Sequence, residues 1–415
     1  MVVDADRLIY DWNTEISEEP GPGRGAVELN DETLRDGLQS PSVRDPSLDQ
    51  KLEILHRMAG LEIESANIGL PGAGPHVVET VRRLAREIVD HGLGVAPNCA
   101  ARTLARDIEP ILRISDEVGL DIEVACFLGS SAIRQFTENW EMDRLLKLAE
   151  DAVALAVGHG LPCMFVTEDT TRAAPEDLER LYEVAVRAGA RRVCIADTVG
   201  HATPRGAREV VRFIRGVVDA IADDVKVDWH GHRDRGLAVE NSIAAAQAGA
   251  DRLHGTALGV GERVGNTPID LLMINLKLMG WIDRDLSGLP DYCRLVAEAT
   301  GTPLPENYPV VGRDAFRTAT GVHAAAIIKA RAKGDERLAD CVYSGVPAGW
   351  VGRRQRIEVG PMSGQSNVVY WLEERGYEVD RNLVETIFQR AKAATSILEE
   401  DEIVAICDDC GAAKS

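Results

Sequence analysis

The sequence predicts an α/β protein, a (β/α)8 or TIM barrel followed by a C-terminal helical appendage. Short apolar, β-branched runs recur at intervals of roughly 25–35 residues, which is the rhythm of repeated βα units. Amphipathic stretches of helical period lie between the runs, such as Leu52, Leu55 and Ala59 on one helix face. A chain of 415 residues is long enough for a barrel of roughly 250 residues and an additional region.

Eight runs carry the strand pattern. They are short and largely apolar, as expected of parallel strands that are buried on both faces. A closed barrel accommodates eight such strands, and a doubly wound open sheet is the alternative. In chain order the predicted strands are Val27–Leu29, Ile63–Ile68, Gly94–Pro97, Ile122–Leu128, Cys163–Val166, Val193–Ala196, Val225–Trp229 and Arg252–Thr256.

The chain is expected to divide into four segments. A turn rich in Pro and Gly at residues 20–23 precedes the first strand. After the eighth βα unit the strand rhythm stops, and Pro303, Pro305 and Pro309 introduce short helices joined by turns. The predicted segments are an N-terminal arm 1–24, the catalytic TIM barrel 25–285, helical subdomains 286–406 and a tail 407–415.

Charge and composition exclude several classes of partner. The chain contains 45% hydrophobic and 27% charged residues, and its formal net charge of -21 would repel nucleic acid and anionic membranes. No apolar run reaches the roughly 18 residues of a membrane helix. The start of the chain carries Asp4, Asp6 and Asp11, where a signal peptide needs a basic and then an apolar region. We therefore expect a cytoplasmic protein with no nucleic-acid partner and no membrane partner.

Two polar segments lie at predicted carboxyl ends of strands, where barrel enzymes place their catalytic groups. Residues 30–39 follow the first strand and combine carboxylates, a guanidinium and an amide. Residues 228–236 end the seventh strand and contain His230 and His232. Side chains alternate along a strand, so both imidazoles should project to the same side, with Gly231 leaving room for an ion. Together they form two corners of a predicted metal site.

A third polar segment, residues 255–266, follows the eighth strand and is rich in glycine. Its spacing matches neither GxGxxG nor the Walker pattern, so dinucleotide binding is not expected. We expect instead a tight loop that brings Asn266 or Glu262 towards the metal. The two histidines, with Asp36 and one more oxygen or amide ligand, suit a divalent metal and leave positions open for substrate oxygens.

Three motifs occur together in one order: Thr33-Leu34-Arg35-Asp36-Gly37-x-Gln39, His230-Gly231-His232 and Gly259-x-Gly261-Glu262-Arg263-x-Gly265-Asn266. In this combination the chain resembles the DRE-TIM metallolyases. From about residue 27 to residue 370 it is similar to their 2-isopropylmalate, homocitrate and citramalate synthase branch. The resemblance implies a TIM-barrel enzyme that uses a divalent metal (Mg, Mn or Zn). Such an enzyme joins the methyl carbon of acetyl-CoA to the ketone of a 2-oxo acid and hydrolyses the thioester.

The resemblance also implies roles for single residues. Asp36, His230 and His232 would be metal ligands, Asn266 a fourth ligand or a partner of the ligands, and Arg35 would face the ketone oxygen. A metal ion and a guanidinium aimed at one carbonyl oxygen would polarise the ketone and hold the alkoxide that forms.

Three more residues match the substrate-binding and catalytic positions of the family. Glu168 matches the acid at the end of strand five. Thr198 matches the threonine that binds the substrate carboxylate, and Gln39 completes the set on the first strand.

The appendage resembles the family as well. The segment 319–323, which ends in His323, corresponds to the family's Ser-Gly-x-His segment, and Tyr343 corresponds to its appendage tyrosine. In relatives these two groups reach the partner subunit's active site and are implicated in acetyl-CoA activation. A histidine poised near neutral pH beside a tyrosine is a reasonable relay for removing the methyl proton. A homodimer with shared active sites is therefore expected.

Other functions remain open on the same scaffold. Leu38 gives the first motif the form Arg-Asp-Gly-Leu-Gln seen in hydroxymethylglutaryl-CoA lyases, so an acyl-CoA lyase or aldolase is the main alternative. Against a lyase, the loop 255–266 lacks the cysteine that lyases use, and lyases lack the segments of His323 and Tyr343. Biotin-dependent carboxyltransferases need a lysine on an inner strand, and only Lys226 of the eight lysines lies beside a strand. A non-catalytic metal-binding protein is the alternative from another class.

The sequence leaves the 2-oxo acid open. The segment Gly129-Ser130-Ser131 resembles homocitrate synthases more closely than isopropylmalate synthases, which often have His at the position of Ala125. Arg102 and Arg134 are candidates for binding a second substrate carboxylate, with surface ion pairs as the alternative, whereas an apolar pocket would suit a branched chain. Because the sequence stops at Ser415, the leucine-binding domain of typical isopropylmalate synthases, and leucine feedback with it, are expected to be absent.

Overall fold

The computed structural model describes two compact units. The residues it describes are 8–13, 21–23 and 25–414. The barrel unit takes its described residues from 19–284 and 291–303, and the C-terminal unit takes them from 1–18, 285–290 and 304–415. Most of the predicted arm, namely residues 1–7, 14–20 and 24, lies outside the described residues.

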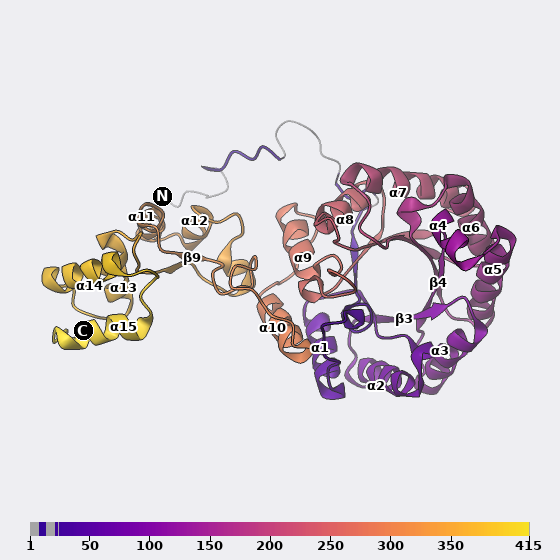
Figure 1. Ribbon diagram of the computed structural model, residues 1–415, viewed down its shortest axis with the longest axis horizontal. Coiled ribbons are helices and arrows are strands. Elements are labelled where there is room, and N and C mark those ends of the chain that lie inside the picture. The colour runs from indigo at the N-terminus through magenta and orange to yellow at the C-terminus, as the bar shows by residue number, and fades with distance from the viewer. Residues whose placement is uncertain (1–7, 14–20, 24, 415) are drawn as a thin grey trace. The chain divides into compact units, whose positions relative to one another are not determined.

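Eight parallel strands close into a barrel in sequence order, with β8 hydrogen-bonded to β1 (Figure 1). The predicted (β/α)8 barrel is confirmed, and the open sheet is excluded. Each predicted strand overlaps an observed one, and the largest difference is at β3, which continues to Arg102. The strands are β1 (Glu28–Asp31), β2 (Ser65–Asn67), β3 (Ala96–Arg102), β4 (Glu123–Gly129), β5 (Cys163–Glu168), β6 (Arg192–Asp197), β7 (Lys226–Gly231) and β8 (Arg252–Gly255).

Helices surround the barrel, and local sequence sets their ends (Figure 1). Ser47 and Gln50 form a reciprocal capping box at the start of α1, and Pro75 occupies the first position of α2. The apolar stripe of α1 buries Leu55 and Met58 against the barrel. The helices are α1 (Leu48–Gly60), α2 (Pro75–His91), α3 (Ala105–Val118), α4 (Ala132–Glu138), α5 (Met142–Gly158), α6 (Pro175–Arg187), α7 (Pro204–Asp219), α8 (Ala238–Gln247), α9 (Ile269–Leu278) and α10 (Leu289–Thr300).

The C-terminal unit is helical with one small sheet. Two parallel strands of two residues each, β9 (Arg317–Thr318) and β10 (Arg356–Ile357), pair in it. The sequence predicts no strand here, because a run of two residues carries no periodicity. The helices are α11 (Gly321–Arg331), α12 (Glu336–Cys341), α13 (Gln365–Glu374), α14 (Arg381–Ala393) and α15 (Glu400–Asp409). None of the helices in the described part of the chain is both long and apolar enough to span a bilayer.

The predicted tail 407–415 begins inside a helix. Helix α15 continues to Asp409 and buries Cys407 in an apolar core with Trp371 and Ile387. Cys410, three residues further along the chain, is exposed. The predicted boundary at residue 407 therefore falls within the last helix and not after it.

Helix α10 lies in the range predicted for the helical subdomains, but residues 291–303 belong to the barrel unit. The buried Tyr292 explains this assignment. Its hydroxyl donates a hydrogen bond to the Asp31 carboxylate and lies 3.1 Å from the Thr33 hydroxyl at the end of β1. A buried phenol needs such partners, so this contact holds α10 against the barrel.

We expect Asp31→Asn to change how stability depends on pH. Burial raises the pKa of the Asp31 carboxyl from 3.8 to about 6, so the folded protein binds this proton more tightly than the unfolded chain does. Ionisation of Asp31 therefore costs stability as the pH rises through this window, by about 3 kcal/mol at pH 7. Asparagine keeps the shape without the charge: its amide oxygen can accept from the Thr33 N–H, and its amide nitrogen would donate to the Tyr292 oxygen in place of accepting from it. Measured by urea unfolding, the free energy of unfolding of the variant minus that of wild type should therefore increase by about 2 kcal/mol between pH 4 and pH 7. A constant difference would contradict this account.

Candidate active site

The loop after β1 places Arg35 and Asp36 at the carboxyl end of the barrel. It folds back on itself, because the backbone N–H groups of Arg35 and Gly37 donate to the Glu32 carbonyl at 3.1 and 3.0 Å. The Glu32 N–H in turn donates to the Gly255 carbonyl on β8 at 2.8 Å. The neighbouring strand thus holds the loop in place.

The two histidines at the end of β7 meet the carboxylate of this loop. The Nε2 atoms of His230 and His232 are 3.2 Å apart, as alternation along the strand predicts. Asp36 Oδ2 lies 3.8 Å from Nε2 of His230 and 3.7 Å from Nε2 of His232. These ligand-type atoms all lie within 4.8 Å of one another, so the structure brings the three predicted ligands together.

The chemistry of these donors fits a divalent metal ion. Burial and the neighbouring His230 lower the pKa of His232, which keeps its imidazole neutral, the form that ligates metals. Burial by itself would raise the pKa of the Asp36 carboxyl. The interactions with Arg35 and His230 lower this pKa by more, so the group is a carboxylate. Asn266 Oδ1 is buried and has no hydrogen-bond partner among the described residues. Two imidazoles, a carboxylate and a free amide oxygen make a suitable ligand set.

The glycine loop after β8 delivers Asn266, one of the two residues predicted to approach the metal. The Asn266 amide donates to Asp36 Oδ2. A Cβ at Gly261 would lie 2.1 Å from Asn266 Oδ1, and a Cβ at Gly265 would lie 1.9 Å from the Gly259 carbonyl oxygen. Glycine is therefore required at both positions for the loop to close over the asparagine.

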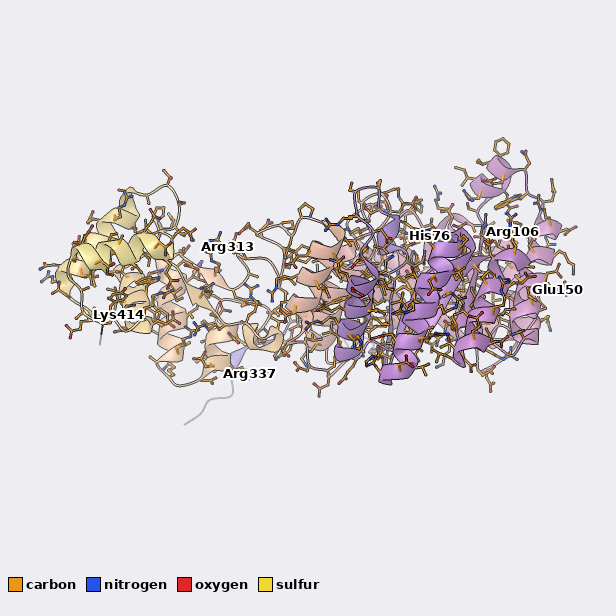
Figure 2. The ribbon with its side chains drawn as sticks, turned by 90° about the horizontal axis from the view of Figure 1, so that it is seen from below. His76, Arg106, Glu150, Arg313, Arg337 and Lys414 are labelled. Atoms are coloured by element: carbon orange, nitrogen blue, oxygen red, sulfur yellow. The ribbon has the colours of Figure 1, made fainter. Side chains whose placement is uncertain are left out.

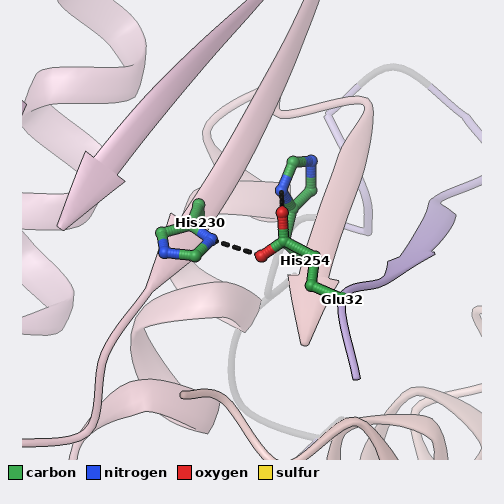
Figure 3. Close-up of side chains that lie close together, drawn as sticks. All are labelled: Glu32, His230 and His254. Carbon is green, nitrogen blue, oxygen red and sulfur yellow. Dashed lines mark hydrogen bonds and ion pairs between the residues drawn. The ribbon is translucent and has the colours of Figure 1, made fainter. Parts of the chain in front are cut away.

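Two residues of the site are missing from the sequence prediction, Glu32 and His254. Figure 3 shows the Glu32 carboxylate between two imidazoles, 2.6 Å from His230 Nδ1 and 3.2 Å from His254 Nδ1. His254 Nε2 also lies 2.9 Å from Asp228 Oδ2. A carboxylate at Nδ1 holds the proton on that nitrogen of His230 and leaves Nε2 free for a ligand bond.

Strand alternation could have identified one of these residues, His254. On β7, Asp228 and His230 occupy every second position, and Arg252 and His254 do the same on β8. All four are buried in the barrel, where Arg252 donates to Asp228 at 2.6 Å. Charged residues at a period of two on adjacent strands therefore indicate a polar barrel interior.

A cavity of about 140 Å³ opens beside these groups. Arg35, Gln39, Glu168 and Thr198 line it together with the histidines and Asp36. Burial raises the pKa of the Glu168 carboxyl. Apolar side chains supply much of the remaining wall, among them Leu70, Ala100, Ala125, Phe127, Met164 and Val166.

Arg102, Arg134 and Ser130 do not belong to the described lining of this cavity. Arg102 forms a two-point ion pair with Asp107, with N–O distances of 2.5 and 2.9 Å, which is the surface-pair alternative. The Ser130 hydroxyl donates to the Glu168 backbone carbonyl at 2.8 Å. Arg134 Nη2 approaches Glu168 Oε2 only to 4.0 Å. A substrate-binding role for these three residues stays a prediction.

Comparison with known proteins agrees with this geometry. The HMGL-like family matches residues 26–296, which contain all three motifs. The chain belongs to the HMGL-like family. Homocitrate synthase AksA of Methanopyrus kandleri is 35% identical to it, over 88% of this chain and 87% of that protein. A probable 2-isopropylmalate synthase of the same organism is 34% identical, over 88% of this chain and 69% of that protein.

The match to solved structures supports the fold. An HMG-CoA lyase of Bacillus subtilis matches this HMGL-like chain with a TM-score of 0.57 and 20% identity, over 69% of this chain and 97% of the lyase. The predicted membership of the DRE-TIM superfamily is confirmed. The relatives also confirm the expected enzyme class, since they are acyltransferase-type condensing enzymes.

The predicted appendage residues lie in the C-terminal unit of the HMGL-like protein. His323, in the first turn of α11, and Tyr343, after α12, place their ring centroids 4.2 Å apart at an interplanar angle of 31°. Both side chains are exposed. The structure thus brings these two predicted residues together, and their access to a partner's active site stays a prediction.

Proposed function

We propose that this protein condenses acetyl-CoA with a 2-oxo acid and hydrolyses the thioester, giving CoA and a 2-alkylmalate-type or homocitrate-type product. The observation that carries the proposal is the convergence of Asp36, His230 and His232 beside Arg35 in one cavity. Relatives named homocitrate synthase, 2-isopropylmalate synthase and citramalate synthase support the same chemistry.

The resident ion would be held by Asp36, His230 and His232, with Asn266 beside them. When bound, a divalent metal ion such as Mg, Mn or Zn supplies Lewis-acid polarisation of the ketone. Glu32 would keep the imidazole of His230 in the orientation and tautomer that ligation needs.

Arg35 would donate to the same ketone oxygen. Its guanidinium is held from two sides, by Glu32 at 3.0 Å and by Asp36 at 2.5 Å, and its buried Nε has no hydrogen-bond partner among the described residues. A fixed donor of this kind stabilises the negative charge that develops on the oxygen as the new carbon–carbon bond forms.

The other lining groups would hold the substrate. The Thr198 hydroxyl and the Gln39 amide can bind the 2-oxo acid carboxylate. Glu168, whose pKa is raised by burial, would bind a proton more readily than an ordinary carboxyl.

Activation of acetyl-CoA would use His323 and Tyr343. Their adjacent rings form a pair that could take the methyl proton and stabilise the base that receives it. We propose that they act in the active site of a partner subunit, in a homodimer. The dimer and the cytoplasmic location stay predictions.

A thiol-release assay tests the proposed reaction. Purified protein with Mg2+, Mn2+ or Zn2+ should release free CoA only when acetyl-CoA and a 2-oxo acid are both present, and chelation should stop the release. The apolar side chains of the wall, such as Leu70, Phe127 and Val166, would accommodate short apolar tails, so we expect pyruvate and 2-oxoisovalerate to react faster than oxaloacetate, 2-oxoglutarate or phosphonopyruvate. Release of acetoacetate or pyruvate from an acyl-CoA substrate would instead support the lyase alternative. Metal binding without turnover of any 2-oxo acid would support a binding protein.

A further inference from the structure

A second group of metal-ligand side chains lies on the helices outside the barrel. His56 on α1, with Glu87 and His91 on α2, brings three ligand-type atoms within 4.8 Å of one another. We propose that these residues form a transition-metal site that bridges the two helices. The proposal does not depend on the reaction assigned to the barrel cavity.

The geometry is close to that of a coordinated ion. Both imidazoles converge on one oxygen, since Glu87 Oε1 lies 2.7 Å from His56 Nε2 and 3.2 Å from His91 Nε2. Ligands at ~2.0–2.1 Å from a tetrahedral zinc ion are about 3.3 Å apart. Opening the His56–Glu87 pair by less than about 1 Å would therefore admit the ion.

The fold holds these three side chains in register. Glu87 and His91 are one turn apart, so they share a face of α2. The adjacent Leu55 on α1 and Ile88 on α2 are buried, which fixes the backbones that carry the ligands. The two imidazole rings meet edge to face, with centroids 5.2 Å apart. Little conformational entropy would remain to be lost on binding.

The donor types select the ion. Two imidazoles and one carboxylate suit Zn2+ and similar first-row dications, whereas Mg2+ and Ca2+ prefer oxygen ligands throughout. The His91 side chain is 55% exposed and Glu87 is 21% exposed, so the ion can enter from solvent and water can complete its coordination. Because only the folded chain brings the two helices together, a bound ion would stabilise the fold.

Zinc stoichiometry tests the proposal. The metal-stripped full-length protein should bind one zinc ion more than the double variant His56→Ala/His91→Ala when both are titrated by calorimetry. The single variant His91→Ala should weaken this ion's affinity at least about tenfold. Zinc should also raise the Tm of wild type by more than that of the double variant, while Mg2+ should not reproduce the difference.

The matched control is His76→Ala. His76, labelled in Figure 2, is an exposed histidine in the first turn of α2, far along the helix from His91. This control should keep the wild-type zinc stoichiometry, and the double variant should keep wild-type thiol release. Equal zinc stoichiometry and affinity in the double variant and the control would overturn the proposal. If wild-type protein released no thiol but bound the additional zinc ion, the function proposed for the barrel cavity would be wrong and the site on α1 and α2 would be supported.

Discussion

Replacing Asp36, His230 or His232 with alanine should lower kcat/KM by about 10³-fold or more, because metal-assisted polarisation contributes several kcal/mol to such a transition state. The same variants should lose the high-affinity metal ion of the barrel, since their ligand atoms converge on one point. Thiol release and metal content measured on the same preparations check both expectations.

Folding controls are needed because these side chains are buried. Asp36→Asn keeps the volume and can keep either the contact with Asn266 or the one with Arg35, so it separates loss of the carboxylate charge from loss of packing. His159→Ala provides a matched surface control and should retain full activity, since the His159 imidazole pairs with the exposed Asp116 carboxylate and lines no part of the barrel cavity. Wild-type turnover in a preparation shown to be free of metal would refute the assigned ligand role.

Arg35→Lys should lower kcat by about 10²–10³-fold while the metal ion stays bound, since this is the usual cost of losing a fixed donor to a developing oxyanion. The Arg35 fork bonds Glu32 and Asp36 at once, and a single ammonium cannot reproduce both bonds while it also faces the substrate. Steady-state thiol release and metal content measured together would show the expected separation.

Arg82→Lys is the matched comparison for this substitution. Arg82 also lies between two carboxylates, those of Glu79 and Glu117, but on the outer helices. The Arg82→Lys variant should therefore keep the wild-type kcat. If Arg35→Lys retained most of the activity, or lost activity only in proportion to lost metal, the proposed role of the guanidinium would be wrong.

Much of the fold could be predicted because its signals are local. A short apolar run followed by an amphipathic stretch indicates each βα unit, and the eight predicted strands all overlap observed ones. The two-residue strands β9 and β10 carry no such signal. The position of α10 was equally inaccessible, because it depends on Tyr292 reaching Asp31 from the other end of the barrel sequence.

The site shows the same division. His230 and His232 could be placed on one side from alternation along a single strand, and three motifs in order pointed to Asp36 and Asn266. Glu32 escaped the prediction because its role depends on two imidazoles from β7 and β8. For Arg102, the structure shows the ion pair with Asp107 that the sequence left open as an alternative, and a role in substrate binding stays a prediction.

By itself, the sequence determined the barrel, the family and the residue types of the candidate metal site, since periodicity and motif spacing are properties of neighbouring residues. Only the tertiary structure decided which charges meet. Glu32 and Asp36 follow β1, whereas the three histidines of the barrel lie at the ends of β7 and β8. Closure of β8 onto β1 brings Glu32 into hydrogen-bonding range of His230 and His254 and places Asp36 3.7–3.8 Å from the imidazoles of His230 and His232. Pairing across a closed barrel depends on register and burial, which no local pattern encodes.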